Sequence, residues 1–260
     1  PSRPRVSDTV ALGKTGIKTS RVAIGTGTDG GKQQRDLGTD GLKRLIRYAH
    51  DEGVRWWDTA DMYKTHSFHA LALQEIQRDE VVITSKTRAH EAAGVRADLE
   101  RFRREMDTDY IDIVLLHCME DPQWPVKLRG CMDVLSEAKE KGWIRAHGVS
   151  CHSLGALRAA ADEPWGEVDL ARFNPFAQIM DVDKKVELGK VEETLERMHQ
   201  HGKAVYAMKV IGNGRFKGDQ IDESLRYALS KPYITALNIG FTSPAQIDDI
   251  DRRLAGMRAA

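Results

Sequence analysis

Four polar side chains with complementary acid–base chemistry occur where apolar stretches of the sequence end. They are Asp58 and Tyr63 in the segment WWDTADMY, Lys86 at the end of VVITSK, and His117 at the end of IDIVLLH. The carboxyl ends of strands in a parallel α/β sheet or barrel lie on one face, so we expect these side chains to converge there. A carboxylate, a phenol, an ammonium and an imidazole in one place would be suited to proton transfer.

The three segments resemble those of the aldo-keto reductase family, through motifs that occur in order along the chain. The motifs are DTADMY at 58–63, TSK at 84–86 and LLH at 115–117. The resemblance implies an α/β fold, a (β/α)8 TIM barrel, with a nicotinamide cofactor (NAD or NADP) across the barrel mouth. It also implies an oxidoreductase that interconverts a carbonyl (aldehyde or ketone) and an alcohol by metal-independent hydride transfer, with the tetrad Asp58, Tyr63, Lys86 and His117.

Acid–base chemistry gives each member of this tetrad a role. A phenol has an ordinary pKa of about 10, so it is a poor acid near neutrality unless its anion is stabilised. An ammonium group within hydrogen-bond reach provides that stabilisation, and a carboxylate keeps the ammonium charged and oriented. We therefore predict Tyr63 as general acid/base, Lys86 as the group that tunes it and Asp58 as the anchor of Lys86. His117 is expected to orient the substrate carbonyl.

Other interpretations of these residues stay open. Asp58 and Lys86 also suit a structural ion pair, because such pairs perturb pKa values without catalysing anything. Two other classes of protein compete with an enzyme of this kind: a catalytically weak, cofactor-binding barrel that acts as a regulatory or partner subunit, and a metal-dependent barrel hydrolase. The hydrolase would need a metal site, but His66 and His69 have no third ligand nearby in the sequence, so we predict no metal.

Length and composition favour one domain, residues 1–260, which is about the size of one complete barrel. Acidic and basic residues both number 39, so no net charge favours nucleic acid or an anionic membrane, and a small-molecule carbonyl or alcohol is the expected partner. No apolar run reaches the roughly 20 residues that span a bilayer. Three cysteines fit a reducing, cytoplasmic location, although an export signal removed before residue 1 would leave the same sequence. The sequence selects no oligomeric state.

Apolar strand patterns alternate with helical ones along the chain, which is typical of parallel pairing. The expected strands are 22–25, 55–58, 81–85, 111–116, 144–149, 168–173, 204–207 and 236–239. The expected helices are 68–77, 93–106, 126–141, 154–161, 190–201, 222–230 and 245–254, with a further one that starts at Thr39 or Asp40 as its N-cap. Residues 10–12 and 17–20 predict a short β-hairpin before the first barrel strand.

Residues 25–30 spell G-x-G-x-x-G, the signature of a Rossmann dinucleotide site. That site requires the third glycine to open a helix directly, so that the pyrophosphate meets the helix amino terminus. Here a polar segment, 31–38, follows instead. We therefore interpret the signature as a glycine-rich barrel loop, in which Gly25 and Thr26 are candidate cofactor contacts.

The resemblance also extends to candidate nicotinamide contacts, with departures from the family pattern. Ser150 matches the serine of the family's Gly-Val-Ser-Asn, whereas Cys151 stands in the place of the asparagine. Asn174 fits the pattern after the next strand. Met208 and Lys209 stand near the family's Tyr-Ser-Pro, so the usual aromatic stack is absent and the polarizable sulfur of Met208 is the partial replacement we expect.

Candidate contacts for the adenosine end of the cofactor follow the last strand. They are Gly240, Phe241, Thr242, Gln246 and Asp249. In the family, members that favour NADPH place basic residues where this chain has Gly240 and Gln246. A 2′-phosphate without a basic partner forfeits a charge-assisted hydrogen bond. We therefore predict that NADPH has no advantage over NADH, unless Arg252, Arg253 or Lys209 restores the charge.

Overall fold

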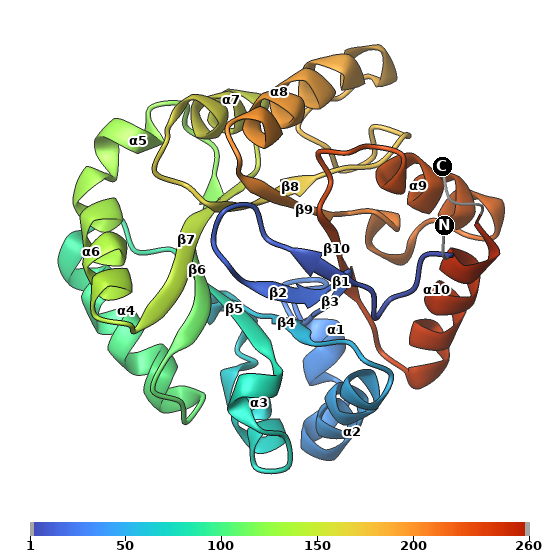
Figure 1. The fold of residues 1–260 in the computed structure, drawn as a ribbon, viewed down its shortest axis with the longest axis horizontal. Helices are drawn as coiled ribbons and strands as arrows, with labels where there is room; N and C mark the ends of the chain where they lie inside the picture. Colours follow the sequence, from blue (N-terminus) through green and yellow to red (C-terminus); the bar gives the residue numbers. More distant parts are fainter. Residues whose placement is uncertain (1–2, 258–260) are drawn as a thin grey trace.

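Eight of the predicted apolar stretches pair in parallel and close into a barrel (Figure 1). The computed structural model describes residues 3–257. Its barrel strands are β3 (Val22–Gly25), β4 (Trp56–Asp58), β5 (Val82–Thr87), β6 (Ile111–Met119), β7 (Ile144–Cys151), β8 (Val168–Arg172), β9 (Ala204–Met208) and β10 (Ala236–Gly240). They follow chain order around the barrel, and β10 returns to pair with β3. The predicted (β/α)8 barrel is confirmed.

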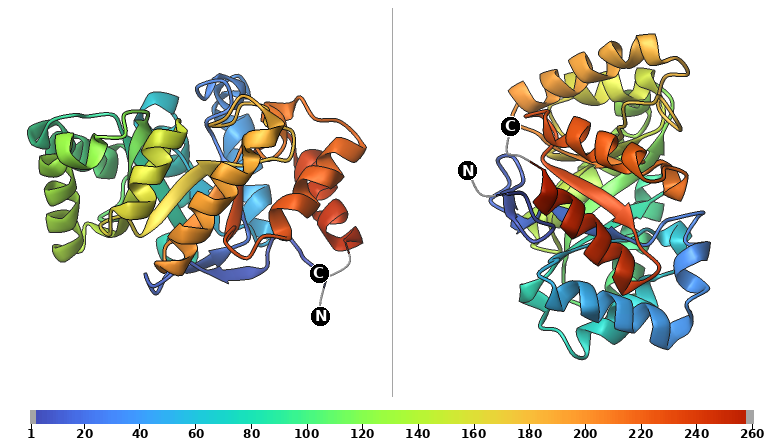
Figure 2. Two further views of the ribbon diagram at one scale, coloured as in Figure 1. Left: turned by 90° about the horizontal axis from the view of Figure 1, so that it is seen from above. Right: turned by 90° about the vertical axis from the view of Figure 1, so that its right-hand side faces the viewer.

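Helices surround the barrel on its outside, as the views in Figures 1 and 2 show. Within the described residues they are α1 (Lys32–Arg35), α2 (Gly38–Asp51), α3 (His66–Leu73), α4 (Ala92–Glu105), α5 (Trp124–Lys127), α6 (Arg129–Glu140), α7 (Leu154–Asp162), α8 (Leu188–Gln200), α9 (Asp219–Leu229) and α10 (Pro244–Gly256). Helix α2 illustrates why: it buries Leu42, Leu45, Ile46 and Ala49, which recur at helical spacing on one face.

Each barrel strand has two apolar faces because successive side chains point to opposite sides of the sheet. In β4, Trp56 belongs to the cluster inside the barrel, whereas Trp57 belongs to the cluster between the barrel and the helices. In β6, Leu115 points inward and Leu116 outward in the same way. This alternation decides which residues at the strand ends face the barrel axis.

The predicted hairpin closes the amino-terminal end of the barrel. Strands β1 (Thr9–Ala11) and β2 (Lys18–Ser20) pair antiparallel, and Figure 2 shows them across one end of the barrel. Leu12 and Ile17, in the turn between them, are fully buried in the cluster inside the barrel. With that end sealed by apolar side chains, the opposite end, where the strands' carboxyl ends lie, remains for chemistry.

Some predicted boundaries were wrong. The helix expected over 126–141 is divided into α5 and α6 at Leu128, whose φ of −106° and ψ of 20° are not helical. The polar segment 31–38 contains the short helix α1. Helix α2 begins at Gly38 with Leu37 as its N-cap, one residue before Thr39, although Gly38 itself has a left-handed φ of 69°. Within residues 3–257, no helix has the length and apolar character needed to cross a membrane.

Candidate active site

The four residues of the predicted tetrad meet at the carboxyl end of the barrel. Asp58 ends β4 and Lys86 lies near the end of β5, each an even number of residues after an inward-facing side chain. His117 follows Leu115 by two in β6. Tyr63 ends the 3₁₀ turn η1 (Asp61–Tyr63), which directly follows β4. The strand period therefore positions three of the side chains, and the turn brings the fourth above them.

Asp58 and Lys86 form a buried ion pair under the site. Lys86 Nζ donates to Asp58 Oδ1 at 2.7 Å and to the carbonyl of Thr59 at 2.8 Å. The side chains of Asp58 and Lys86 are 1% and 0% exposed. Burial lowers the pKa of Lys86, and the charge and hydrogen bond of Asp58 oppose this shift. The second oxygen of the Asp58 carboxylate accepts a hydrogen bond from the hydroxyl of Tyr206 at 2.9 Å.

Tyr63 lies closer to the histidine than to the lysine. Its hydroxyl is 3.4 Å from His117 Nε2, whereas Lys86 Nζ lies 5.0 Å from the centre of the Tyr63 ring. The direct lysine–phenol hydrogen bond that tuning would use does not occur within residues 3–257, where Lys86 is engaged by Asp58 and Thr59. Burial, followed by the charge of Asp58, raises the pKa of Tyr63 well above its ordinary value. The phenol is therefore held in its protonated form.

A glycine allows the phenol to take this position. A Cβ atom placed on Gly27 would lie 2.4 Å from Cζ of Tyr63, which is impossible without displacement of the ring. The G-x-G-x-x-G signature thus serves the barrel loop as interpreted from the sequence, in part by giving space to Tyr63.

His117 is held in its neutral form. Burial lowers its pKa to about 2, and the nearby charges of Lys86, His152 and Arg88 act in the same direction. Its Nδ1 atom is buried without a hydrogen-bond partner in the described part of the chain, and its Nε2 atom faces the Tyr63 hydroxyl. A neutral imidazole in this position can accept or donate one hydrogen bond at Nε2, according to its tautomer.

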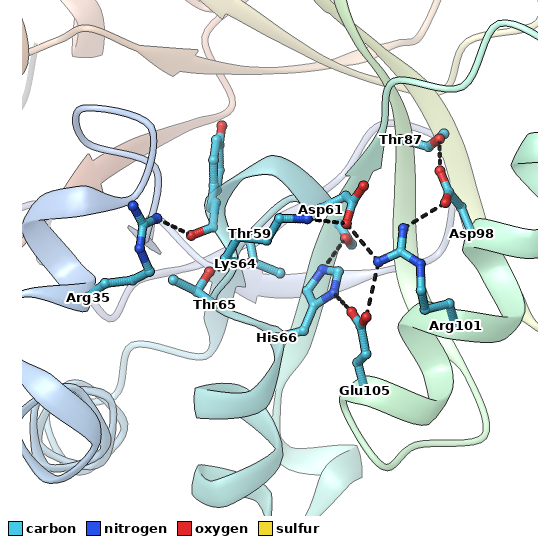
Figure 3. Close-up of polar contacts among 12 residues, drawn as sticks. Arg35, Thr59, Asp61, Lys64, Thr65, His66, Thr87, Asp98, Arg101 and Glu105 are labelled. Carbon is cyan, nitrogen blue, oxygen red and sulfur yellow. Dashed lines mark hydrogen bonds and ion pairs between the residues drawn. The ribbon is translucent and has the colours of Figure 1, made fainter.

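A network of charged residues holds the turn that carries Tyr63 (Figure 3). Arg101 of α4 donates to Asp61 of the turn at 2.7 Å. The same guanidinium binds Asp98 at 2.7 Å and Glu105 at 3.0 Å, both on its own helix. A guanidinium with several carboxylate partners is a rigid link, because its planar fork fixes the direction of each bond. Helix α4 therefore fixes the position of the turn relative to β5 and β6.

A histidine connects this network to the strand of the lysine. His66 Nδ1 lies 2.7 Å from Glu105, and its Nε2 lies 2.8 Å from the hydroxyl of Ser85, the neighbour of Lys86. From another direction, Arg35 donates to the carbonyl of Tyr63. His66, considered above as a possible metal ligand, thus has protein partners at both ring nitrogens.

A continuous cleft runs from Tyr63 to helix α10. Its inner part, of about 60 Å³, is bounded by the catalytic candidates Asp58 and Tyr63. Its outer part, of about 420 Å³, ends among the residues that follow β10. The two parts share Thr28, Lys209, Asn213, Asn238 and Gly240. Eight residues predicted to bind the cofactor line the cleft: Gly25, Met208, Lys209, Gly240, Phe241, Thr242, Gln246 and Asp249.

Four other predicted cofactor contacts have structural roles in this chain. Thr26 bonds to the carbonyl of Asp58 and to Thr65, and Ser150 accepts from the amide of Cys118 at 2.9 Å. Cys151 is fully buried in the cluster between the barrel and the helices.

Asn174 is the fourth of these residues. Its Nδ2 donates to the carbonyls of Gln178 and Lys209, and its Oδ1 accepts from the amides of Phe176 and Gln178. Both ends of its amide are thus occupied within the loops after β8 and β9, so none of its hydrogen-bonding capacity is turned to the cleft.

The cleft itself fits an extended polar ligand. Asn238 Oδ1 is buried on its wall without a hydrogen-bond partner in the described residues, so it can accept from a ligand amide. Gly240 lies so close to Thr28 that a Cβ atom there would be 2.0 Å from its hydroxyl. These features suit a dinucleotide whose nicotinamide end lies next to Tyr63.

Several residues of the site carry no recognisable signal in the sequence. Tyr206 reads as an ordinary inward-facing residue of β9, and its bond to Asp58 depends on barrel closure across the interior. Asn213, Asn238 and Lys217 line the cleft from loops and a strand whose side chains form no recognisable motif. Arg101 is one of several arginines on α4, and only packing shows that it holds Asp61.

The chain is similar to known proteins along most of its length. The model of the aldo/keto reductase family matches residues 21–224. A protein from Arabidopsis thaliana described as a probable voltage-gated potassium channel subunit beta is 23% identical over 95% of this chain and 76% of its own length. An NADH-specific methylglyoxal reductase from Escherichia coli is 25% identical over 66% of this chain and 60% of its own length.

A solved structure shares the fold. The holo form of an aldo-keto reductase from Bacillus halodurans superposes with a TM-score of 0.78 at 16% identity, over 98% of this chain and 92% of that one. The closed parallel barrel, the motifs at its strand ends and the family match define one class: the chain belongs to the aldo/keto reductase family. It is an oxidoreductase of this family, whose members generally use NAD(P)H.

Proposed function

We propose that this protein reduces a small-molecule carbonyl compound to an alcohol with NAD(P)H, with Tyr63 as the proton donor. The observation that carries the proposal is the cleft that begins at Asp58 and Tyr63 and continues past Gly240 to Gln246. It offers one site for a reacting carbonyl beside a proton donor, and a second, contiguous space for the remainder of a dinucleotide. The residues that would hold the cofactor are those that line this cleft.

The geometry gives each tetrad residue a task. The bound cofactor would supply a hydride. A carbonyl oxygen placed against both Tyr63 Oη and His117 Nε2, which lie 3.4 Å apart, receives a hydrogen bond from the phenol and one from a neutral imidazole protonated at Nε2. Tyr63 then gives its proton to that oxygen. Lys86, 5.0 Å from the ring centre, carries the positive charge that stabilises the phenolate left behind, and Asp58 keeps Lys86 in place.

A second candidate function is that of a partner subunit with little catalysis. The specific observation in its favour is the description of the Arabidopsis relative as a channel subunit. The two functions differ in a single-turnover experiment, in which the protein is loaded with NADH or NADPH and mixed with a panel of aldehydes. Oxidation of the bound cofactor within seconds supports the enzyme, and its persistence over many minutes with every aldehyde favours the subunit.

The pH dependence of reduction is expected to be flat. Since the pKa of His117 is lowered to about 2 by burial, the imidazole is neutral throughout the range from about pH 6 to about pH 9. The phenol of Tyr63 stays protonated over the same range because burial raises its pKa. We expect kcat/KM for reduction of an uncharged aldehyde to vary less than about threefold across this range, in buffers of constant ionic strength. An inflection near pH 6.5, where an ordinary histidine titrates, would contradict this account of His117.

The cofactor preference is expected to be weak. Gln246 is neutral, and its side-chain oxygen accepts from the amide of Thr242 at 2.7 Å. Arg253 lines the same cavity, but it is held by Asp249 at 2.7 Å and by Asp222 at 2.8 Å. Because Gln246 is neutral and Arg253 is already paired with two carboxylates, neither is available to a 2′-phosphate, and fluorescence titration should give dissociation constants for NADH and NADPH within about tenfold of each other.

A gain-of-charge variant sharpens the test of cofactor preference. Gln246→Arg should tighten NADPH by about ten- to a hundredfold, because it adds a charge-assisted hydrogen bond, and should leave NADH nearly unchanged. The prediction fails if the unsubstituted protein already binds NADPH more than tenfold tighter. In that case Lys217, which lines the cavity and was not anticipated from the sequence, is the cation to replace next.

A further inference from the structure

Two arginines at the carboxyl end of the barrel have no part in the proposed reduction. Arg88 follows the inward-facing Lys86 by two residues, and Arg172 follows the inward-facing Leu170 by two. Arg172 therefore keeps the inward register of β8, whereas Arg88 lies one residue past the end of β5, at the mouth of the barrel. Arg172 is the register partner of Met208, and Met208 lines the inner part of the cleft with Tyr63.

These arginines have donors available. Arg88 is exposed and has neither a hydrogen bond nor an ion pair with any residue in the range 3–257. Arg172 faces Asp181, but the separation of 3.6 Å between Nη1 and Oδ1 is too long for a hydrogen bond. Its Nε atom is buried and lacks a partner in the described residues. This N–H is therefore available to a ligand, as is the Nε of Arg103 and of Arg197 elsewhere in the described residues.

The charges of both arginines reach the site of the reacting carbonyl. After burial, the positive charge of Arg88 contributes to the lowered pKa of His117. The pKa of His152 is lowered to about 3, mainly by burial and next by the positive charge of Arg172. His152 Nε2 in turn lies 3.9 Å from Cys118 Sγ, and the rings of His152 and His117 are 6.5 Å apart. His117, Cys118 and His152 therefore lie together beside the Tyr63 hydroxyl, and the charges of Arg88 and Arg172 act on this group.

Two carboxyl groups, those of Glu120 and Asp181, face these side chains but offset the positive charges there only in part. Glu120 is exposed beyond Cys118, whose pKa it raises against the charges of Arg88, Lys86 and Arg172. Burial raises the pKa of Asp181 to about 7, so near neutrality this carboxyl is about half protonated and compensates Arg172 only in part.

We propose that Arg88 and Arg172 form a subsite for a carboxylate on the substrate, so that the preferred substrates are carbonyl compounds that also carry a carboxylate. This inference rests on the proposed function, because it assigns the substrate class of the same site. Guanidinium groups bind carboxylates through paired, charge-assisted hydrogen bonds that fix direction as well as charge. A carboxylate held there would orient the carbonyl between Tyr63 and His117.

The test compares matched substrates. The kcat/KM values of 2-, 3- and 4-formylbenzoate are measured against those of their methyl esters, which carry an aldehyde but no charge. At least one acid should be preferred over its ester by about tenfold or more. Arg88→Gln should reduce that preference by about tenfold and should leave the ester within about threefold. Because Arg172→Gln alone would leave Asp181 buried without its cation, it is made together with Asp181→Asn and should have the same effect.

The control is Arg158→Gln, which removes an exposed arginine from α7 and should leave the preference unchanged. Binding of benzoate to the NADH-loaded protein is measured by calorimetry in parallel, so that the subsite is tested even if none of these aldehydes is reduced. Benzoate binding that weakens in both arginine variants supports the subsite independently of turnover. Equal kcat/KM for every acid and its ester, or a preference that both arginine variants retain, overturns the inference.

Discussion

Replacement of Tyr63 by phenylalanine is expected to lower kcat for carbonyl reduction by about 10²- to 10⁴-fold, the range that a positioned general acid contributes. The substitution removes only the hydroxyl oxygen, which lies 3.4 Å from His117 Nε2. The ring still packs against Gly27, and the turn that carries it is still held through Asp61 by Arg101. Rates are measured with a saturating aldehyde and saturating NADH.

Cofactor affinity provides the control for this variant. If Tyr63 acts on the transition state and not on binding, Tyr63→Phe should bind NADH within about threefold of the parent protein in a fluorescence titration. Turnover near the parent rate would remove Tyr63 from the role of acid. A large loss of cofactor affinity together with turnover would indicate a structural role instead.

Asp58→Asn is expected to destabilise the fold by about 3–5 kcal/mol, because it leaves the buried ammonium of Lys86 without its counter-charge. The pair is almost fully buried, and after the substitution Lys86 has only neutral acceptors, the carbonyl of Thr59 and the amide oxygen of the new side chain. The hydroxyl of Tyr206 also loses a charged acceptor. The free energy of unfolding is measured by urea denaturation, with the slope compared between variants to check that both unfold in the same way.

A double variant distinguishes the loss of the ion pair from the separate effects of changing each residue. Asp58→Asn combined with Lys86→Met removes the uncompensated charge, so it should be less destabilising than the sum of the two single changes by at least about 1 kcal/mol. The exposed pair between Lys32 and Asp36 supplies the matched control, since Asp36→Asn should cost less than about 1 kcal/mol. Strict additivity of the buried pair, or a cost for Asp58→Asn no larger than that of Asp36→Asn, would contradict this account.

The barrel and the convergence of the tetrad were predictable because both follow from short-range rules. The period of two along each strand places Asp58, Lys86 and His117 on the inward face, and the alternation of strands with helices enforces parallel pairing. The strand ends then meet at one edge whatever the details of packing. The helix boundaries that were wrong, such as the division at Leu128, depend on local backbone angles that apolar periodicity does not report.

Contacts between distant segments were not predictable, since they arise only when the barrel closes. Tyr206 reaches Asp58 across 148 residues of sequence. Lys86 pairs with Asp58 as expected, but its other hydrogen bond goes to the carbonyl of Thr59 and not to the phenol. The candidate cofactor contacts that came from family motifs fall into two groups, those that line the cleft and those whose side chains are engaged within the chain. Residues after β10 line the cleft, whereas the side chain of Asn174 is occupied by bonds to the chain's own backbone.

Hydride transfer itself is the central claim, and isotope transfer tests it most directly. The protein is mixed with an aldehyde and with NADH that carries deuterium at the transferable position of the nicotinamide, and the alcohol is analysed by mass spectrometry. The account predicts one deuterium on the former carbonyl carbon in the parent protein, and a rate of incorporation that falls by about 10²- to 10⁴-fold in Tyr63→Phe. A protein that binds NADH tightly yet transfers no deuterium to any aldehyde of a broad panel, including the carboxylate-bearing ones, would contradict it.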